Sequence, residues 1–227
     1  MGRGWLVATA AVGVAACGGA REQPPAEVRT VTVEIGDPSQ QGDRQGPAKP
    51  AADRRTPADV PGDEQCAGAG DATTAENVRE AEIAIRCLTN AVRSKHDLEE
   101  LRFDERLARA AATRSNDMAE QRYFAHEGPD GGDVQRAVRR TGWIPEKRSW
   151  LLGENIGWAP EGRATPVDLM RSWLDSPTHR ANILNEHYTE LGVGAVAAVP
   201  KADAKPGATY TQVFGVTGRA ARIAQAG

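Results

Sequence analysis

The feature that most restricts the fold of this 227-residue chain is a change in composition between its N-terminal part and the rest. From Gly18 to about Glu64 the sequence is rich in Pro, Gly, Gln and charged residues, and it has one short alternating apolar run, VRTVTVEI. Such a segment cannot bury enough apolar surface to offset the chain entropy lost on folding. We therefore predict a disordered tether over residues 18–64 and one folded domain over residues 65–220.

The N-terminal sequence MGRGWLVATAAVGVAAC has the order of an export signal. Arg3 precedes an apolar run from Trp5 to Ala16, and this run is shorter than the roughly 20 residues that a membrane-spanning helix needs. The run ends in VAAC, which resembles the lipobox of bacterial lipoproteins. The resemblance implies that residues 1–17 are a lipoprotein signal peptide and that Cys17 becomes lipidated. An ordinary signal peptide with a chance cysteine is the alternative.

Two further cysteines, Cys66 and Cys87, lie in the predicted domain. An export signal implies an oxidising compartment, where a lone pair of cysteines usually forms a disulfide. We predict a bond between Cys66 and Cys87, which is worth about 3 kcal/mol in the chain-entropy estimate for a loop of this length. Two unpaired thiols are the alternative.

The spacing of apolar residues predicts four helices in the domain, and Ser176 with Pro177 begins a further short one that carries His179. Thr73 and Glu76 stand at capping-box spacing at the start of the first helix. Asp104 is placed to cap the second, and the third is the short segment DVQRAVRRTG. Thr165 followed by Pro166 begins the fourth helix, because these residues favour the cap and the first helical position.

Two runs near the C-terminus, LGVGAVAAV and ATYTQVFGV, are predicted to be strands. The loop between them is too short for a crossover helix, so the pair should be antiparallel. Helices followed by strands that are interleaved with a helix predict an α+β fold, with helices packed on an antiparallel sheet.

The run WLLGENIGW places one carboxylate inside strand-like apolar sequence. On a strand, Glu154 shares a face with three apolar side chains, those of Leu152, Ile156 and Trp158. A carboxylate on an apolar face is costly unless a partner meets it. Asn155 would face the other side of the strand, where we expect it to hold a neighbouring loop.

Two of the four histidines are candidates for that partner. His126 follows an aromatic pair in a loop, and His179 lies in the first turn of a short helix close to Asp175. Two imidazoles with one or two carboxylates form a set that can bind a divalent cation. The alternative to a metal site is a structural role, in which both histidines hydrogen-bond to Glu154 and to backbone groups. The other two histidines, in RSKHDLEE and NEHYTEL, are expected to be exposed.

No complete enzyme motif is present: the sequence lacks HExxH, GxSxG and a P-loop. Ser176 precedes Pro177 and is better explained as a helix cap than as a nucleophile. A Cys66–Cys87 disulfide leaves no thiol nucleophile in the domain. Charged residues make up 26% of the chain and the net charge is −3, which gives no indication of a nucleic-acid partner.

Five motifs, YFAH, GENIGWA, SWLDSPTHRANIL, ELGVG and YTQVFG, occur in this order. Together they closely resemble the bacterial branch of the CAP superfamily (cysteine-rich secretory proteins, antigen 5 and pathogenesis-related proteins), also called SCP domains, over roughly residues 80–216. The resemblance implies an α-β-α sandwich with a central antiparallel sheet. It also implies a large cleft lined by two histidines and two acidic residues, which in family members can hold zinc or another divalent cation.

The resemblance assigns the cleft residues one by one. The histidines of YFAH and SPTHR are His126 and His179, and the glutamate of GENI is Glu154. The fourth residue, a glutamate in many eukaryotic relatives, has no clear match, and Asp175 is the nearest carboxylate. The expected cofactor is Zn²⁺ or another divalent cation, with water completing its shell, and no organic cofactor is expected.

These features predict an exported lipoprotein that is anchored to the cell envelope through a lipid on Cys17. Gly18 leaves open whether the anchor lies in the plasma membrane or the outer membrane. We expect a monomer whose cleft binds a cation and a small apolar ligand, a wall component or a protein partner. The absence of a committed nucleophile favours binding over catalysis. The alternative is a metal-assisted hydrolase acting on peptide or cell-wall glycan, in which His126, Glu154 and His179 serve as acid, base or metal ligands.

Overall fold

Within the part of the chain that the structure describes, five strands form one sheet in the order β1-β3-β5-β4-β2. The computed structural model describes residues 27–33, 60, 64–146, 148–201, 206–218 and 221. The strands, in sheet order, are β1 (Glu27–Val33), β3 (Trp150–Pro160), β5 (Gly207–Thr217), β4 (Glu190–Val196) and β2 (Arg102–Phe103). The predicted signal peptide with Cys17, and most of the predicted tether, lie outside the described residues.

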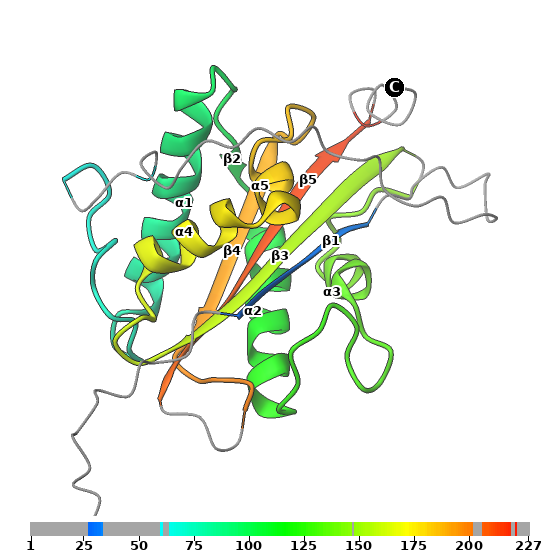
Figure 1. Cartoon of the computed structure of the whole chain (residues 1–227). Coiled ribbons are helices and arrows are strands. Elements are labelled where there is room, and N and C mark those ends of the chain that lie inside the picture. The colour runs from blue at the N-terminus through cyan, green and yellow to red at the C-terminus, as the bar shows by residue number, and fades with distance from the viewer. Residues whose placement is uncertain are drawn as a thin grey trace, which may run out of the picture.

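Helices cover both faces of the sheet (Figure 1). One face carries α2 (Glu105–Glu120) and α3 (Val134–Arg140), and the other carries α1 (Val78–Lys95), α4 (Pro166–Asp175) and α5 (Pro177–Ile183). Adjacent residues of β3 enter different cores, because side chains on a strand alternate between faces. Leu151 packs in the core beneath α1 and α4, whereas Leu152 packs in the core beneath α2 and α3. The predicted α+β class and α-β-α sandwich are confirmed.

None of the helices in the described residues has the length and apolarity needed to cross a bilayer.

The central strands are antiparallel, but the sheet has one parallel pair. β3 pairs antiparallel with β5, and β5 pairs antiparallel with β4, as predicted for the last two strands. The short strand β2 instead pairs parallel with the beginning of β4, with Arg102 opposite Glu190. The predicted antiparallel pairing is present at the centre of the sheet, and the parallel edge strand β2 was not predicted. Several helices separate β2 from β4 in the chain, and a long connection permits a parallel pair.

The predicted helix starts are correct for α2 and α4 and wrong in detail for α1. Asp104 caps α2, accepting hydrogen bonds from two backbone N–H groups, and Thr165 caps α4. The capping box predicted for α1 is absent, because this helix begins after Asn77. The hydroxyl of Thr73 is buried and hydrogen-bonds the hydroxyl of Tyr210 on β5. Thr73, whose spacing from Glu76 predicted a helix cap, therefore makes a tertiary contact instead.

Strand β1 lies inside the stretch that was predicted to be a disordered tether. It pairs antiparallel with β3 along its whole length, with Val31 opposite Glu154. The alternation in VRTVTVEI is the sequence signal of this strand. An exposed edge of β3 would present unpaired backbone donors and acceptors, and β1 satisfies them. The structure thus differs from the predicted tether at residues 27–33.

The predicted disulfide between Cys66 and Cys87 is present, and the two Cα atoms are 5.7 Å apart. Cys66 is buried in the segment before α1, and Cys87 lies on α1 itself. The bond therefore fastens an irregular segment to the face of the sandwich that carries α1 and α4.

Replacing both cysteines with alanine is expected to lower the free energy of unfolding by about 2–3 kcal/mol. The disulfide joins residues 21 positions apart, and its loss restores conformational freedom to the unfolded chain. Urea unfolding of the double variant and of the wild type, each with and without reductant, measures the difference. Reductant should destabilise only the wild type, and an equal response in both proteins would contradict the prediction.

Candidate functional site

Glu154 has two partners, and one of them is an arginine. The glutamate is fully buried on β3. Its Oε1 accepts a hydrogen bond from Nε of Arg114 at 3.0 Å, and its Oε2 lies 2.6 Å from Nδ1 of His126. These two contacts offset the electrostatic cost of burying a carboxylate on an apolar face. The predicted contact between Glu154 and His126 is present.

Arg114 also holds the loop that carries His126. It projects from α2, and its side chain is only 3% exposed. Its Nη2 donates to the backbone carbonyls of Ala125 and His126, each at 2.9 Å. Its Nη1 donates to the hydroxyl of Tyr123 at 2.8 Å. Burial alone would lower the pKa of Arg114, but the carboxylate of Glu154 raises it above its ordinary value. One charged side chain therefore fixes both the strand carboxylate and the loop.

The hydroxyl of Tyr123 extends this network toward α2. It donates to Oδ2 of Asp117 at 2.5 Å while it accepts from Arg114. Burial, together with the hydrogen bond to Asp117, raises the pKa of Tyr123 to about 12. Tyr123 therefore stays protonated at neutral pH and acts as a fixed link between α2 and the loop.

His126 has one ring nitrogen engaged and one without a partner. Because a carboxylate only accepts, Nδ1 is the atom that donates to Glu154. Nε2 is buried and has no hydrogen-bond partner among the described residues. The imidazole is thereby oriented, and its second nitrogen is buried. Oriented imidazoles of this kind serve as metal ligands or as acid–base groups.

Asn155 faces the opposite side of β3, as predicted, and it ties down a helix rather than a loop. Its Nδ2 donates to the backbone carbonyl of His179 at 3.2 Å and to Oε1 of Gln212 on β5 at 3.0 Å. Its Oδ1 accepts from Nδ2 of Asn182 at 3.0 Å. These bonds fasten α5 to the sheet, and they place His179, which is buried in the first turn of α5.

The predicted cation set is not assembled, because Glu154 contacts His126 on the face of β3 that α2 covers, whereas His179 lies on α5 at the opposite face. The described residues contain no group of three or more His, Cys, Asp or Glu side chains that could hold a metal ion. Both oxygens of Glu154 are engaged, and the guanidinium of Arg114 opposes a cation there. Asp175 is exposed at the end of α4. The buried Nε2 of His126 fits the role of a ligand, and Glu154 fits the role of the carboxylate that orients it.

Arg114 is the site residue that the sequence analysis missed. It lies on the same face of its helix as Leu107, Ala111 and Met118, all of which are buried. A charged residue at an apolar position of an amphipathic helix is a signal that it meets an opposite charge. Matching this position with the lone carboxylate on the apolar face of the strand would have found the pair.

The family model described as the Cysteine-rich secretory protein family, CAP, matches residues 88–213. The match covers more than half of the chain, so the chain belongs to this family, and the predicted resemblance is confirmed. His126, Glu154 and His179 all lie within the matched residues.

Two curated relatives come from Bacillus subtilis (strain 168). The chain is similar to YkwD, described as an uncharacterized protein, with 37% identity over 127 residues that cover 56% of this chain and 44% of YkwD. It is also similar to YlbC, described as an uncharacterized membrane protein, with 36% identity over 107 residues that cover 47% of this chain and 29% of YlbC. The chain thus spans less than half the length of these curated relatives.

Among solved structures, the chain is similar to an extracellular protein containing an SCP domain from Bacillus anthracis str. Ames. The identity is 34% and the TM-score is 0.49, over 63% of this chain and 43% of that one.

Proposed function

We propose that this chain is an exported lipoprotein, anchored to the cell envelope through Cys17, whose CAP domain binds a divalent cation at His126. With the cation it binds a small apolar ligand, a wall component or a protein partner. The observation that carries the proposal is the state of His126, which is oriented through Nδ1 and has a buried Nε2 without a partner among the described residues. Neutral imidazole nitrogen is a favoured ligand of Zn²⁺.

Glu154 has an indirect role in this proposal. Arg114 and His126 occupy its two oxygens, so the carboxylate orients an imidazole instead of coordinating the cation. A carboxylate in this position fixes the tautomer of the ligating histidine and raises its basicity. Asp175 is exposed and stays outside the proposed set. His126 would provide the protein ligand and water would complete the shell, because His179 lies at the opposite face of the sheet.

Zn²⁺ titration of the purified chain should show binding that is lost in His126→Ala and retained in His179→Ala, because His179 lies at the opposite face of the sheet. Glu154→Gln should retain binding that is weaker by about ten- to a hundredfold, because an orienting carboxylate tunes a ligand without being one. Affinity should also fall as the pH is lowered, since protons compete for the imidazoles. Isothermal titration calorimetry measures all of these effects.

His96→Ala and His187→Ala are the matched controls for this titration. His96 ends α1 and His187 lies in the turn before β4, so both lie outside the proposed site. Unchanged Zn²⁺ affinity in His126→Ala, or loss in either control, would refute the cation site. Melting curves recorded with chelator should match those without it, because the fold has its own cores and does not depend on the cation.

The proposed location is supported by the lipobox and by the descriptions of two similar proteins. The solved Bacillus anthracis protein is named as extracellular, and YlbC is named as a membrane protein. The described residues of this chain contain a disulfide, which fits an oxidising compartment outside the cytoplasm.

Cys17→Ala is expected to move the protein from the detergent phase to the aqueous phase of a Triton X-114 extraction. The thiol is the only attachment point for the lipid in the lipobox, so its loss removes the anchor. Cys87→Ala, which removes a different cysteine, should leave the partition unchanged. Retention of Cys17→Ala in the detergent phase would show that lipidation at this site is wrong.

The alternative function, a metal-assisted hydrolase, is favoured by one observation, the 2.6 Å contact between Glu154 and Nδ1 of His126. A carboxylate that orients an imidazole is also how general bases are positioned. Incubation of the chain with peptidoglycan and with casein, with and without Zn²⁺, distinguishes the two functions. Cleavage products that disappear in His126→Ala would replace the binding proposal with the hydrolase.

A further inference from the structure

A second candidate site lies at the amino end of α2, away from His126. A cavity of about 270 Å³ opens there between the beginning of α2, the loop that leads from α3 to β3, and the ends of β4 and β5. Its wall includes Arg106, Trp143, Pro145, Arg148 and Glu190. The loop of His126 follows the other end of α2, and a helix of this length separates its ends by about 24 Å. The two sites are therefore distinct.

The carboxylate in this cavity is already neutralised. Oε1 of Glu190 accepts from Nη2 of Arg102 at 2.8 Å, and its Oε2 accepts from the indole Nε1 of Trp143 at 2.8 Å. Both oxygens are thus engaged, and Arg102 compensates the charge. Glu190 serves to hold the Trp143 ring in the wall, since the indole would otherwise bury an unpaired donor.

The two other charged residues that line the cavity are arginines. Arg106 binds Asp104 through Nε at 3.3 Å and Nη2 at 2.8 Å, and its Nη1 has no partner among the described residues. Arg148 has neither an ion pair nor a side-chain hydrogen bond among the described residues, and it is exposed. The loop at Arg148 is held in place, because the backbone N–H of Gly218 donates to the carbonyl of Ser149 at 2.7 Å. Among the described residues, the lining therefore has one uncompensated positive charge.

We propose that this cavity binds the carboxylate of a small organic acid, such as the C-terminal group of a one- or two-residue peptide. A guanidinium matches a carboxylate in planar, two-point geometry. One uncompensated positive charge suits a monoanion better than a phosphate dianion. The volume lies below the usual range for drug-sized ligands, which suits a small acid.

The test uses the full chain and four probes. N-acetylalanine and acetyl-Ala-Ala carry a free carboxylate, acetyl-Ala-Ala amide lacks it, and inorganic phosphate offers a dianion. Binding is followed by NMR titration of the indole N–H resonance of Trp143, which reports on the cavity itself. The two acids should shift this resonance saturably, the amide should not, and phosphate should bind more weakly than the acids.

Arg148→Ala should weaken acid binding by about tenfold or more, because it removes a charged hydrogen-bond donor. Its melting temperature should match that of the wild type, since Arg148 has no partner among the described residues. Arg171→Ala is the control, because Arg171 is an exposed arginine whose ion pair among the described residues is with Asp168 on α4. His126→Ala should leave acid binding intact even where Zn²⁺ binding is lost. Equal binding of acid and amide, tighter binding of phosphate, or equal affinities of Arg148→Ala and Arg171→Ala would overturn the proposal.

Discussion

Arg114→Met is expected to lower the free energy of unfolding by about 3–5 kcal/mol, because it leaves the buried carboxylate of Glu154 without its compensating charge. Arg114 is 3% exposed and Glu154 is not exposed at all, so water cannot replace the lost contact. The variant also removes the donors that bind the carbonyls of Ala125 and His126. The loop of His126 should therefore become more mobile, and hydrogen exchange of its amides should accelerate. Urea unfolding gives the loss of stability.

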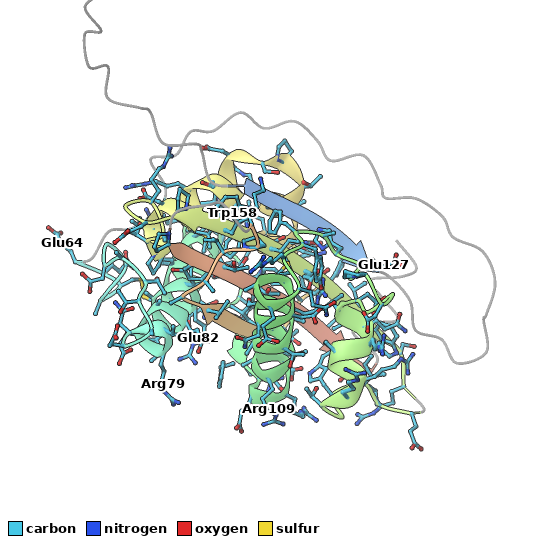
Figure 2. The ribbon with its side chains drawn as sticks, turned by 90° about the horizontal axis from the view of Figure 1, so that it is seen from below. Glu64, Arg79, Glu82, Arg109, Glu127 and Trp158 are labelled. Carbon is cyan, nitrogen blue, oxygen red and sulfur yellow. A yellow bond between two sulfur atoms is a disulfide. The ribbon has the colours of Figure 1, made fainter. Side chains whose placement is uncertain are left out.

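Two further variants make this prediction specific. Arg109 lies on the same helix, is exposed, and pairs with Glu105 at the surface (Figure 2). Arg109→Ala should therefore change the free energy of unfolding by less than about 0.5 kcal/mol. The double variant Arg114→Met/Glu154→Leu should be more stable than Arg114→Met alone, because it removes the unpaired charge. If Arg114→Met were as stable as Arg109→Ala, the ion pair would not be a determinant of the fold.

Gly194→Ala is expected to destabilise the domain by about 3 kcal/mol or more. α2 packs directly on the backbone of β4, and a Cβ at Gly194 would lie 2.0 Å from the backbone nitrogen of Ala112. A helix backbone cannot move aside as a flexible side chain can, so the whole of α2 would have to shift. Because the same helix carries Arg114, the contact between Arg114 and Glu154 should weaken as well. Thermal and urea unfolding measure the effect.

Gly142→Ala is the matched control for this steric effect. Gly142 has φ +74°, and a Cβ there would meet nothing within 4 Å. Its substitution introduces backbone strain without a clash and should cost about 1 kcal/mol. Equal destabilisation by the two alanine substitutions would show that the close approach of α2 to β4 does not limit packing.

The sequence predicted the parts of the fold that depend on local pattern. The caps at Asp104 and Thr165, the last two strands and the disulfide follow from residue type and spacing, and all are present. The cap at Thr73 was wrong, because a local pattern does not reveal that its hydroxyl meets Tyr210 far along the chain. β1 was likewise missed, since the free edge of β3 becomes visible only after the sheet is assembled.

The candidate site, like the fold, was predicted only in part. The position of Glu154 on a strand showed that a partner was required, and the family motifs selected His126. The motifs did not include Arg114, which lies in a different element and joins the site only through the packing of α2 on the sheet. A carboxylate among histidines suggested direct metal coordination. The arginine at 3.0 Å assigns the carboxylate a supporting role instead.

The pairing of β1 with β3 determines how far the domain can stand from a bilayer. Under the proposed lipidation of Cys17, only residues 18–26 separate the anchor from the first residue of β1. Even fully extended, this connecting segment is at most about 36 Å long. The sheet edge at Glu27, opposite Trp158, would then lie closest to the membrane surface. The domain would therefore meet its ligands close to the membrane surface. Detachment of β1 from β3 would lengthen the connecting segment and let the domain move further from the membrane.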